Sequence, residues 1–214
     1  MLISELAKQV HENAVAHGWW EENREAPEIN ALIHSEWSEG LEEARAGRPL
    51  VWYDIYDRGD DCGGGGRCSA MVNEGVCSGR NGKCERNHKP EGVAVELIDG
   101  CIRILDYMGE MEVTVQDNDS EALSEIESLY SEEIIAEAEK PIAHIIAYLH
   151  MLTSEALSDA EVSPIIGDMN PMKLLSAMAL ALSWVKNQGL DPLALLLEKH
   201  EYNKTRPYKH GKKF

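Results

Sequence analysis

Apolar residues recur at helical spacing along most of the chain. The pattern predicts helices over residues 1–16, 27–46, 92–108, 121–152, 171–187 and 193–202. Gly18, Gly47 and Gly109 follow three of these segments as stop signals, and Pro141 is expected to break or kink the fourth. Because no stretch alternates polar and apolar residues over a useful length, the fold is expected to be an all-α helix bundle.

The segment 54–90 interrupts this helical pattern. It is rich in Gly, Cys, Asn and Arg, has four consecutive glycines at 63–66, and predicts no regular element beyond short turns. We therefore expect a single all-α domain over 1–214, with a cysteine-rich loop inserted between its second and third helices. The acidic helical segment 117–163 is a second addition to the bundle.

Composition narrows the class of partner. The net charge of -18 would repel phosphate backbones over most of the surface, which argues against nucleic acid as a partner. No apolar run is long enough to span a bilayer, and residues 1–18 lack the features of a signal peptide. Five cysteines in a chain without an export signal favour reduced thiols, so we expect a cytoplasmic protein that contacts no membrane.

Acidic residues fall on one side of two predicted helices. At about 100° per residue, each set forms a stripe roughly 60–80° wide: Glu36, Glu39 and Glu43 on one helix, and Glu96, Asp99, Arg103 and Asp106 on the other. The second helix is apolar on nearly every other side, so it is expected to be buried. Clustered buried carboxylates repel one another unless they are protonated or bridged by a cation. Two such stripes facing each other would hold a divalent ion, and oxygen-only ligands favour magnesium or manganese over zinc. The alternative is a pair of amphipathic helices with solvated acidic faces.

The last sixteen residues concentrate positive charge in an acidic protein. They hold six of the 20 Lys and Arg residues. Lys199 and Asn203 share one helix face, and Arg206 follows just beyond the helix end. An ammonium, an amide and a planar guanidinium together suit a polyphosphate, although a frayed, solubilising terminus is the alternative.

These features together resemble the MazG-like branch of the all-α nucleotide pyrophosphohydrolases. The family pattern is an E-x-x-E helix followed by an E-x-x-D helix, which here are Glu36-Trp-Ser-Glu39 and Glu96-Leu-Ile-Asp99. The phrases ALIHSEWSEGLEEAR, KPEGVAVELIDGCIRILDYMG and KHEYNKTRPYKHGKK are similar to the helices and closing tail of this family. The similar segments are approximately residues 1–50, 88–110 and 170–212.

The resemblance implies an activity: hydrolysis of a (d)NTP to a (d)NMP and pyrophosphate, in nucleotide-pool housekeeping. The two acidic pairs would coordinate Mg²⁺, with Mn²⁺ as a substitute, and Lys199, Asn203 and Arg206 would hold the β and γ phosphates. Glu43 is a further candidate, as an extra ligand or as a base that orients water. A homodimer or higher homo-oligomer is implied as well.

Candidates for recognition of the base lie at the end of the first predicted helix, in the sequence HGWW. His17 and Trp20 are the candidate substrate-binding residues there, because flat aromatic faces stack on nucleobases. Trp19 and Trp20 are adjacent and cannot both face one pocket, so at most one of them would stack. The alternative for both is a place in the core or in a subunit interface. Trp37 is predicted to lie in the core.

Four cysteines lie in a loop that has almost no apolar residues to pack: Cys62, Cys68, Cys77 and Cys84. Four thiolates on one structural Zn²⁺ would order such a loop, and His88 could replace one of them. The spacing is irregular and contains no C-x-x-C pair, so redox-active disulfides and a disordered loop stay open. Cys101 is predicted to be a core thiol.

A second function from another class is a non-catalytic, zinc-stapled acidic helical adaptor that binds a basic partner. The Glu96–Asp99 stripe on an otherwise apolar helix favours the enzyme, because an adaptor has no need for it.

Overall fold

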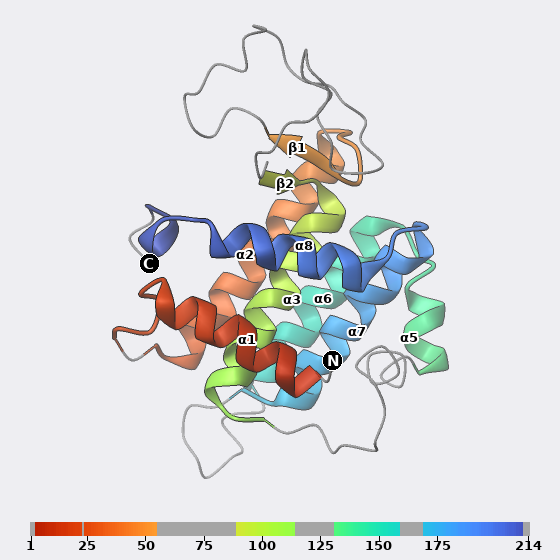
Figure 1. The fold of residues 1–214 in the computed structure, drawn as a ribbon. Helices are drawn as coiled ribbons and strands as arrows, with labels where there is room; N and C mark the ends of the chain where they lie inside the picture. The colour runs from red at the N-terminus through yellow and green to blue at the C-terminus, as the bar shows by residue number, and fades with distance from the viewer. Residues whose placement is uncertain (1–2, 23, 55–88, 114–130, 159–168, 212–214) are drawn as a thin grey trace, which may run out of the picture.

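The computed structural model describes residues 3–22, 24–54, 89–113, 131–158 and 169–211. This part of the chain is mostly helical, as the apolar pattern predicts (Figure 1). In chain order its helices and strands are α1 (Ile3–Ala16), α2 (Ala26–Arg45), β1 (Trp52–Asp54), β2 (Lys89–Glu91), α3 (Val93–Glu110), α5 (Glu132–Glu137), α6 (Ile142–Ser158), α7 (Pro171–Asn187), α8 (Pro192–Lys204) and the 3₁₀ helix η2 (Tyr208–Gly211).

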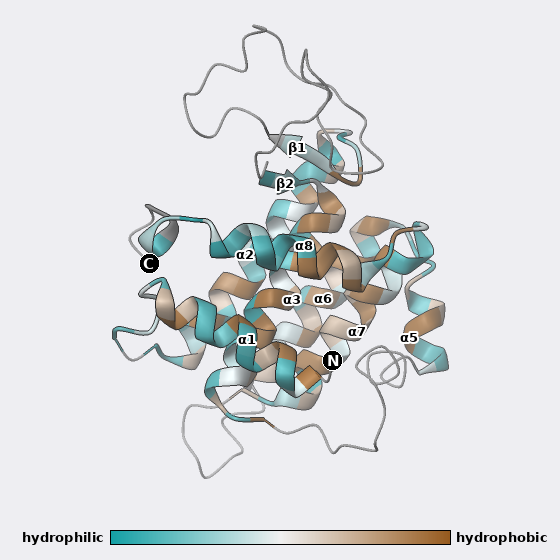
Figure 2. Cartoon of the chain, viewed as in Figure 1, coloured by the Kyte–Doolittle hydropathy of each residue, from teal (hydrophilic) through white to brown (hydrophobic). Residues whose placement is uncertain are grey.

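Helix α3 is the central element of the described fold (Figure 1). It packs against α1, α2, α7 and α8, while α6 packs between α2 and α7. Its apolar residues are buried on nearly every side, as its composition predicts. Figure 2 shows that hydrophobic residues also dominate α6 and α7, and these helices continue the same core.

A glycine brings the two acidic helices together. A Cβ added at Gly100 of α3 would lie only 2.1 Å from the ring of Trp37, so the indole packs directly on the α3 backbone. Trp37 is fully buried, as predicted, and its Nε1 donates a hydrogen bond to Thr153 Oγ1 at 3.0 Å. Because Trp37 lies between Glu36 and Glu39 in sequence, its packing places those carboxylates beside α3.

Gly109 does not end the third helix, contrary to the prediction. Helix α3 continues to Glu110, and Gly109 instead allows α1 to cross it closely. A Cβ at this position would lie 2.5 Å from His11 Cβ and 2.7 Å from the Ala7 carbonyl oxygen. The glycine is therefore needed for close packing between helices. From the sequence alone, a glycine in this role cannot be distinguished from one that ends a helix.

The prediction of no regular element over 54–90 is also wrong at the edges of that segment. Strands β1 and β2 form an antiparallel pair in which Trp52 lies opposite Glu91. Two strands of three residues are too short to produce a pattern of alternation that the sequence could reveal.

The long helix predicted over 121–152 is interrupted at Pro141, as expected. Helix α5 begins after Ser131, whose side chain accepts a hydrogen bond from the Ile134 amide, and α6 begins at Ile142. Residues 114–130 lie outside the described part of the chain. No helix in the described ranges has both the length and the apolar character that a bilayer span requires.

The cysteine loop lies outside the described residues. Cys62, Cys68, Cys77, Cys84 and His88 all belong to it. The zinc site therefore stays a prediction. Cys101 is fully buried in α3, which confirms its place in the core.

Candidate functional site

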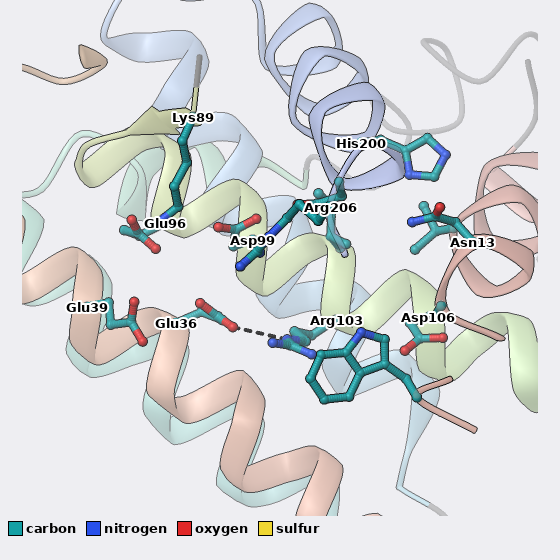
Figure 3. A pocket seen from close by; sticks show the side chains of 15 residues that line it. Asn13, Glu36, Glu39, Lys89, Glu96, Asp99, Arg103, Asp106, His200 and Arg206 are labelled. Atoms are coloured by element: carbon teal, nitrogen blue, oxygen red, sulfur yellow. Dashed lines mark hydrogen bonds and ion pairs between the residues drawn. The ribbon is translucent and has the colours of Figure 1, made fainter. Parts of the chain in front are cut away.

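A pocket lies between α1, α2, α3 and α8 (Figure 3). One side of it is a stripe on α3, where residues at successive spacings of three, four and three share a face: Glu96, Asp99, Arg103 and Asp106. The space between the lining side chains is about 840 Å³, part of which is open to solvent.

Three carboxylates from the two acidic helices converge in this pocket. Oxygen atoms of Glu36, Glu39 and Glu96 all lie within 4.8 Å of one another. Figure 3 shows the three side chains together, with two reaching out from α2 and one from α3. Glu36 and Glu96 are buried, whereas Glu39 is exposed. The sequence prediction that the E-x-x-E and E-x-x-D helices face each other is therefore matched by the packing of α2 on α3.

Burial makes this cluster electrostatically unfavourable. Desolvation, with a smaller contribution from the charge of Asp99, raises the pKa of Glu96 to about 9. Desolvation also raises the pKa of Glu36, although Arg103 opposes the shift. Buried carboxylates with raised pKa values favour either a bound proton or a bound cation.

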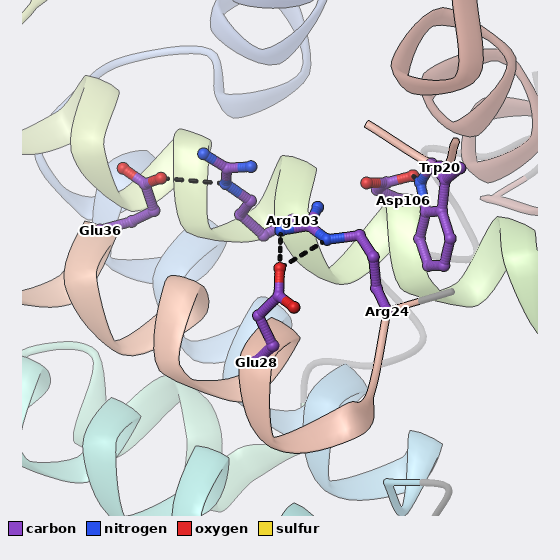
Figure 4. A network of polar contacts seen from close by, with 6 residues as sticks. All are labelled: Trp20, Arg24, Glu28, Glu36, Arg103 and Asp106. Atoms are coloured by element: carbon purple, nitrogen blue, oxygen red, sulfur yellow. Dashed lines mark hydrogen bonds and ion pairs between the residues drawn. The ribbon is translucent and has the colours of Figure 1, made fainter. Parts of the chain in front are cut away.

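Arg103 is in direct contact with one member of the cluster. Its Nε donates to Glu36 Oε1 at 3.0 Å, and its guanidinium lies 5.8 Å from the centroid of the Trp19 ring. Arg24, which precedes α2, donates to Glu28 in the first turn of that helix at 2.8 and 2.9 Å (Figure 4). Charged groups therefore follow one another from Glu36 along this side of α3.

Asp99 lines the pocket but is not part of the converging trio. Its carboxylate lies 2.9 Å from Lys199 Nζ, which also donates to the Pro90 carbonyl oxygen at 3.0 Å. Lys199 is only 1% exposed and does not line the pocket, contrary to what its predicted phosphate contact requires. A buried ammonium needs such partners to offset its desolvation, so Lys199 anchors α8 and β2 to α3.

Glu43 also lies away from the cluster. It accepts hydrogen bonds from Trp52 Nε1 at 2.8 Å and from Arg48 at 2.9 Å, beside the start of β1. It does not line the pocket. The partners of Glu43 lie in β1 and in the segment before it, and the acidic stripe could not indicate the position of either.

His17 and Trp20, the candidates for base recognition, do not line the pocket either. The His17 ring lies 2.7 Å from the Asn13 carbonyl oxygen and 3.0 Å from that of Arg206, so it fixes the tail against α1. Trp20 donates to Asp106 Oδ1 at 2.9 Å. Its neighbour Trp19 lines the pocket instead, in keeping with the expectation that both indoles cannot do so.

Asn203 and Arg206 do line the pocket. The sequence did not select several other lining residues as site residues: Asn13, Lys89, Arg103, Asp106, His200 and Trp19, which was weighed only as an alternative to Trp20. Arg103 and Asp106 lie on the acidic stripe of α3, and that signal could have identified them. Asn13 and His200 reach the pocket only because α1 and α8 pack on α3, and no spacing in the sequence predicts that contact.

The pocket thus combines hard oxygen ligands with nearby cationic side chains, an arrangement suited to a metal-bound phosphate compound. No known protein family, curated protein or solved structure was found to match the chain.

Proposed function

We propose that this chain is a magnesium-dependent nucleoside triphosphate pyrophosphohydrolase of the MazG-like, all-α kind. It would hydrolyse a (d)NTP to a (d)NMP and pyrophosphate. The observation that carries the proposal is the convergence of Glu36, Glu39 and Glu96 within 4.8 Å, on two helices that face one pocket. The homo-oligomer that the resemblance implies is part of the same proposal.

The acidic trio fits a magnesium ion. All three ligands are carboxylates, which suit a hard cation, and the pKa of about 9 at Glu96 reflects desolvation and, to a smaller extent, charge repulsion, which a bound cation would offset. Glu36, Glu39 and Glu96 would hold the ion, with Asp99 beside them on the α3 stripe. When bound, magnesium supplies polarisation of phosphoryl oxygens and a bound water of lowered pKa.

Cationic side chains beside the trio would bind the rest of the polyphosphate. Arg206 and Lys89 line the same pocket, and their charge and N–H groups suit phosphate oxygens. Lys199 would act indirectly, because its ion pair holds Asp99 in place. Arg103 keeps Glu36 oriented through its 3.0 Å hydrogen bond.

The test is product analysis with a panel of nucleoside triphosphates, with and without Mg²⁺. The proposal predicts pyrophosphate and the monophosphate, and only when the metal is present. Orthophosphate with a diphosphate would mean cleavage at another position. No turnover of any nucleotide would favour the acidic adaptor instead.

A Glu39→Gln variant tests the metal assignment. It removes one carboxylate charge from the trio at an exposed side chain, so turnover is expected to fall at least about a hundredfold while helical content is unchanged. Glu42→Gln is the matched control, because Glu42 is an exposed residue of the same helix that pairs with Arg45 outside the pocket. Near-normal turnover by Glu39→Gln would show that this carboxylate does not serve the reaction.

A further inference from the structure

Two residues of α8 bring buried polar atoms without partners to the pocket. Within the described part of the chain, both ring nitrogens of His200 and Oδ1 of Asn203 are buried and have no hydrogen-bond partner. These residues are 1% and 8% exposed, and both line the pocket. A buried polar group left without a partner is unfavourable, and a polar ligand in the pocket would supply the missing partner.

A carboxylate is held in place beside them. Asp106 is 7% exposed and lines the pocket, and its Oδ1 lies 3.0 Å from His11 Nδ1 and 2.9 Å from Trp20 Nε1. Neither His11 nor Trp20 lines the pocket, so both hold the carboxylate from behind. The second oxygen of Asp106 is left to accept a hydrogen bond from a ligand.

This end of the pocket is well separated from the acidic trio. Glu96 and Asp106 are ten residues apart on α3, which corresponds to about 15 Å along a helix axis. Figure 3 shows Asn13, Asp106 and His200 on one side of the pocket and the acidic trio on the other, with Arg103 and Arg206 between them. A nucleotide whose phosphates lie at the acidic end would extend its nucleoside toward Asp106.

We propose that Asn13, Asp106, His200 and Asn203 form a nucleoside subsite, in which Asp106 accepts a hydrogen bond from an amino group of the base or a hydroxyl of the sugar. The proposal rests on the proposed function, because the ligand is the nucleoside part of that substrate. An ionised carboxylate only accepts hydrogen bonds, so it selects N–H or O–H donors and repels carbonyl oxygens. Neutral His200 offers one donor and one acceptor, and Asn13 offers both through its amide.

The test is equilibrium binding of nucleosides that carry no phosphate, in the presence of EDTA, to the full-length wild-type chain and its variants. Adenosine and cytidine are expected to bind the wild type. Asp106→Asn is expected to weaken binding of one or both at least about tenfold, because a charge-assisted hydrogen bond is lost. Glu110→Gln is the matched control, since Glu110 also pairs with His11, at 3.2 Å, but does not line the pocket.

Analogues separate the two sources of the donor. Purine riboside and pyrimidin-2-one riboside lack the amino group of the base. If the base supplies the donor, these analogues are expected to bind the wild type as weakly as adenosine and cytidine bind the Asp106→Asn variant. If the sugar supplies the donor, 2′,3′-dideoxynucleosides are expected to show that weakened binding instead. Either result supports the subsite.

Asn13→Ala gives a second variant at an intermediate-burial position of α1, where alanine suits the helix. It is expected to weaken nucleoside binding about threefold to tenfold. The subsite is overturned if no nucleoside binds the wild type at millimolar concentration. It is also overturned if the folded variants bind nucleosides as the wild type does.

These outcomes are separate from those of the proposed function. If nucleosides bind in a way that depends on Asp106 but no triphosphate is hydrolysed, the subsite is supported and the hydrolase proposal is contradicted. If pyrophosphate is released but nucleoside binding does not depend on Asp106, the hydrolase proposal is supported and the subsite is contradicted.

Discussion

Charged side chains around the pocket are held by partners from other elements. Arg103 on α3 pairs with Glu36 on α2, Lys199 on α8 pairs with Asp99 on α3, and His11 on α1 contacts Asp106 on α3. Removing one member of a buried pair leaves the other charge without compensation, at a large cost in stability. These pairs therefore fix the pocket residues in place and join the helices that carry them.

The contact between His11 and Asp106 predicts a pH-dependent contribution to stability. The hydrogen bond from His11 to Asp106, helped by the charges of Asp106 and Glu110, raises the pKa of His11 above its usual 6.5 despite partial burial. A raised folded-state pKa stabilises the fold fully below pH 6.5, and this contribution disappears as pH rises through the folded-state pKa.

Urea unfolding of the wild type and His11→Gln at pH 5.5 and pH 8.5 measures this contribution. The loss of unfolding free energy in His11→Gln is expected to be larger at pH 5.5. An equal loss at both values would mean that the protonated imidazole does not stabilise the fold.

At the scale of elements, the contact between α2 and α3 depends on the absence of a side chain at Gly100. Gly100→Ala would force a methyl group to within 2.1 Å of the Trp37 ring. Overpacking of this kind costs about 1–3 kcal/mol, and it would also separate the acidic trio. We expect a lower unfolding free energy in urea and weaker magnesium binding.

Gly40→Ala is the control for the same pair of helices. Its Cβ would lie 3.6 Å from Glu96 Cβ, which is an ordinary contact, and alanine favours a helix over glycine by up to about 1 kcal/mol. This variant is expected to be as stable as the wild type or more so. Equal effects of the two substitutions would contradict the assigned role of Gly100.

The helices that begin with local signals were the predictable part of the fold. Helix α7 starts at Pro171 as predicted, after Asn170 caps its first turn, and α8 starts at Pro192 after Asp191. The facing carboxylates were also predictable, because residues three apart on a mostly apolar helix indicate one polar seam.

Features that depend on contacts between distant elements were not predictable. The burial of Lys199 requires Asp99 and the Pro90 carbonyl group, which lie about 100 residues earlier in the chain. The role of Gly109 depends on how α1 crosses α3. Sequence spacing reports which residues share a face of one helix, but not which neighbouring helix that face meets.

At the scale of the whole molecule, the net charge of -18 and the buried acidic pocket predict that divalent cations stabilise the fold. An ion that binds only the native state stabilises it by about 2.7 kcal/mol at a hundred times its Kd. The midpoint of thermal unfolding is therefore expected to rise with Mg²⁺ concentration.

Sodium chloride at matched ionic strength separates site binding from general screening of the surface charge. It is expected to raise the midpoint less than Mg²⁺ does, and the difference is expected to shrink in Glu39→Gln. A response to Mg²⁺ that sodium chloride reproduces would assign the effect to screening alone.

The most direct test of the central claim is to locate a bound Mn²⁺ ion by anomalous X-ray scattering from crystals of the full chain. Manganese substitutes for magnesium among oxygen ligands. We predict an anomalous peak between the carboxylates of Glu36, Glu39 and Glu96. A peak elsewhere, or none at millimolar Mn²⁺, would contradict the claim that helices α2 and α3 form a metal site.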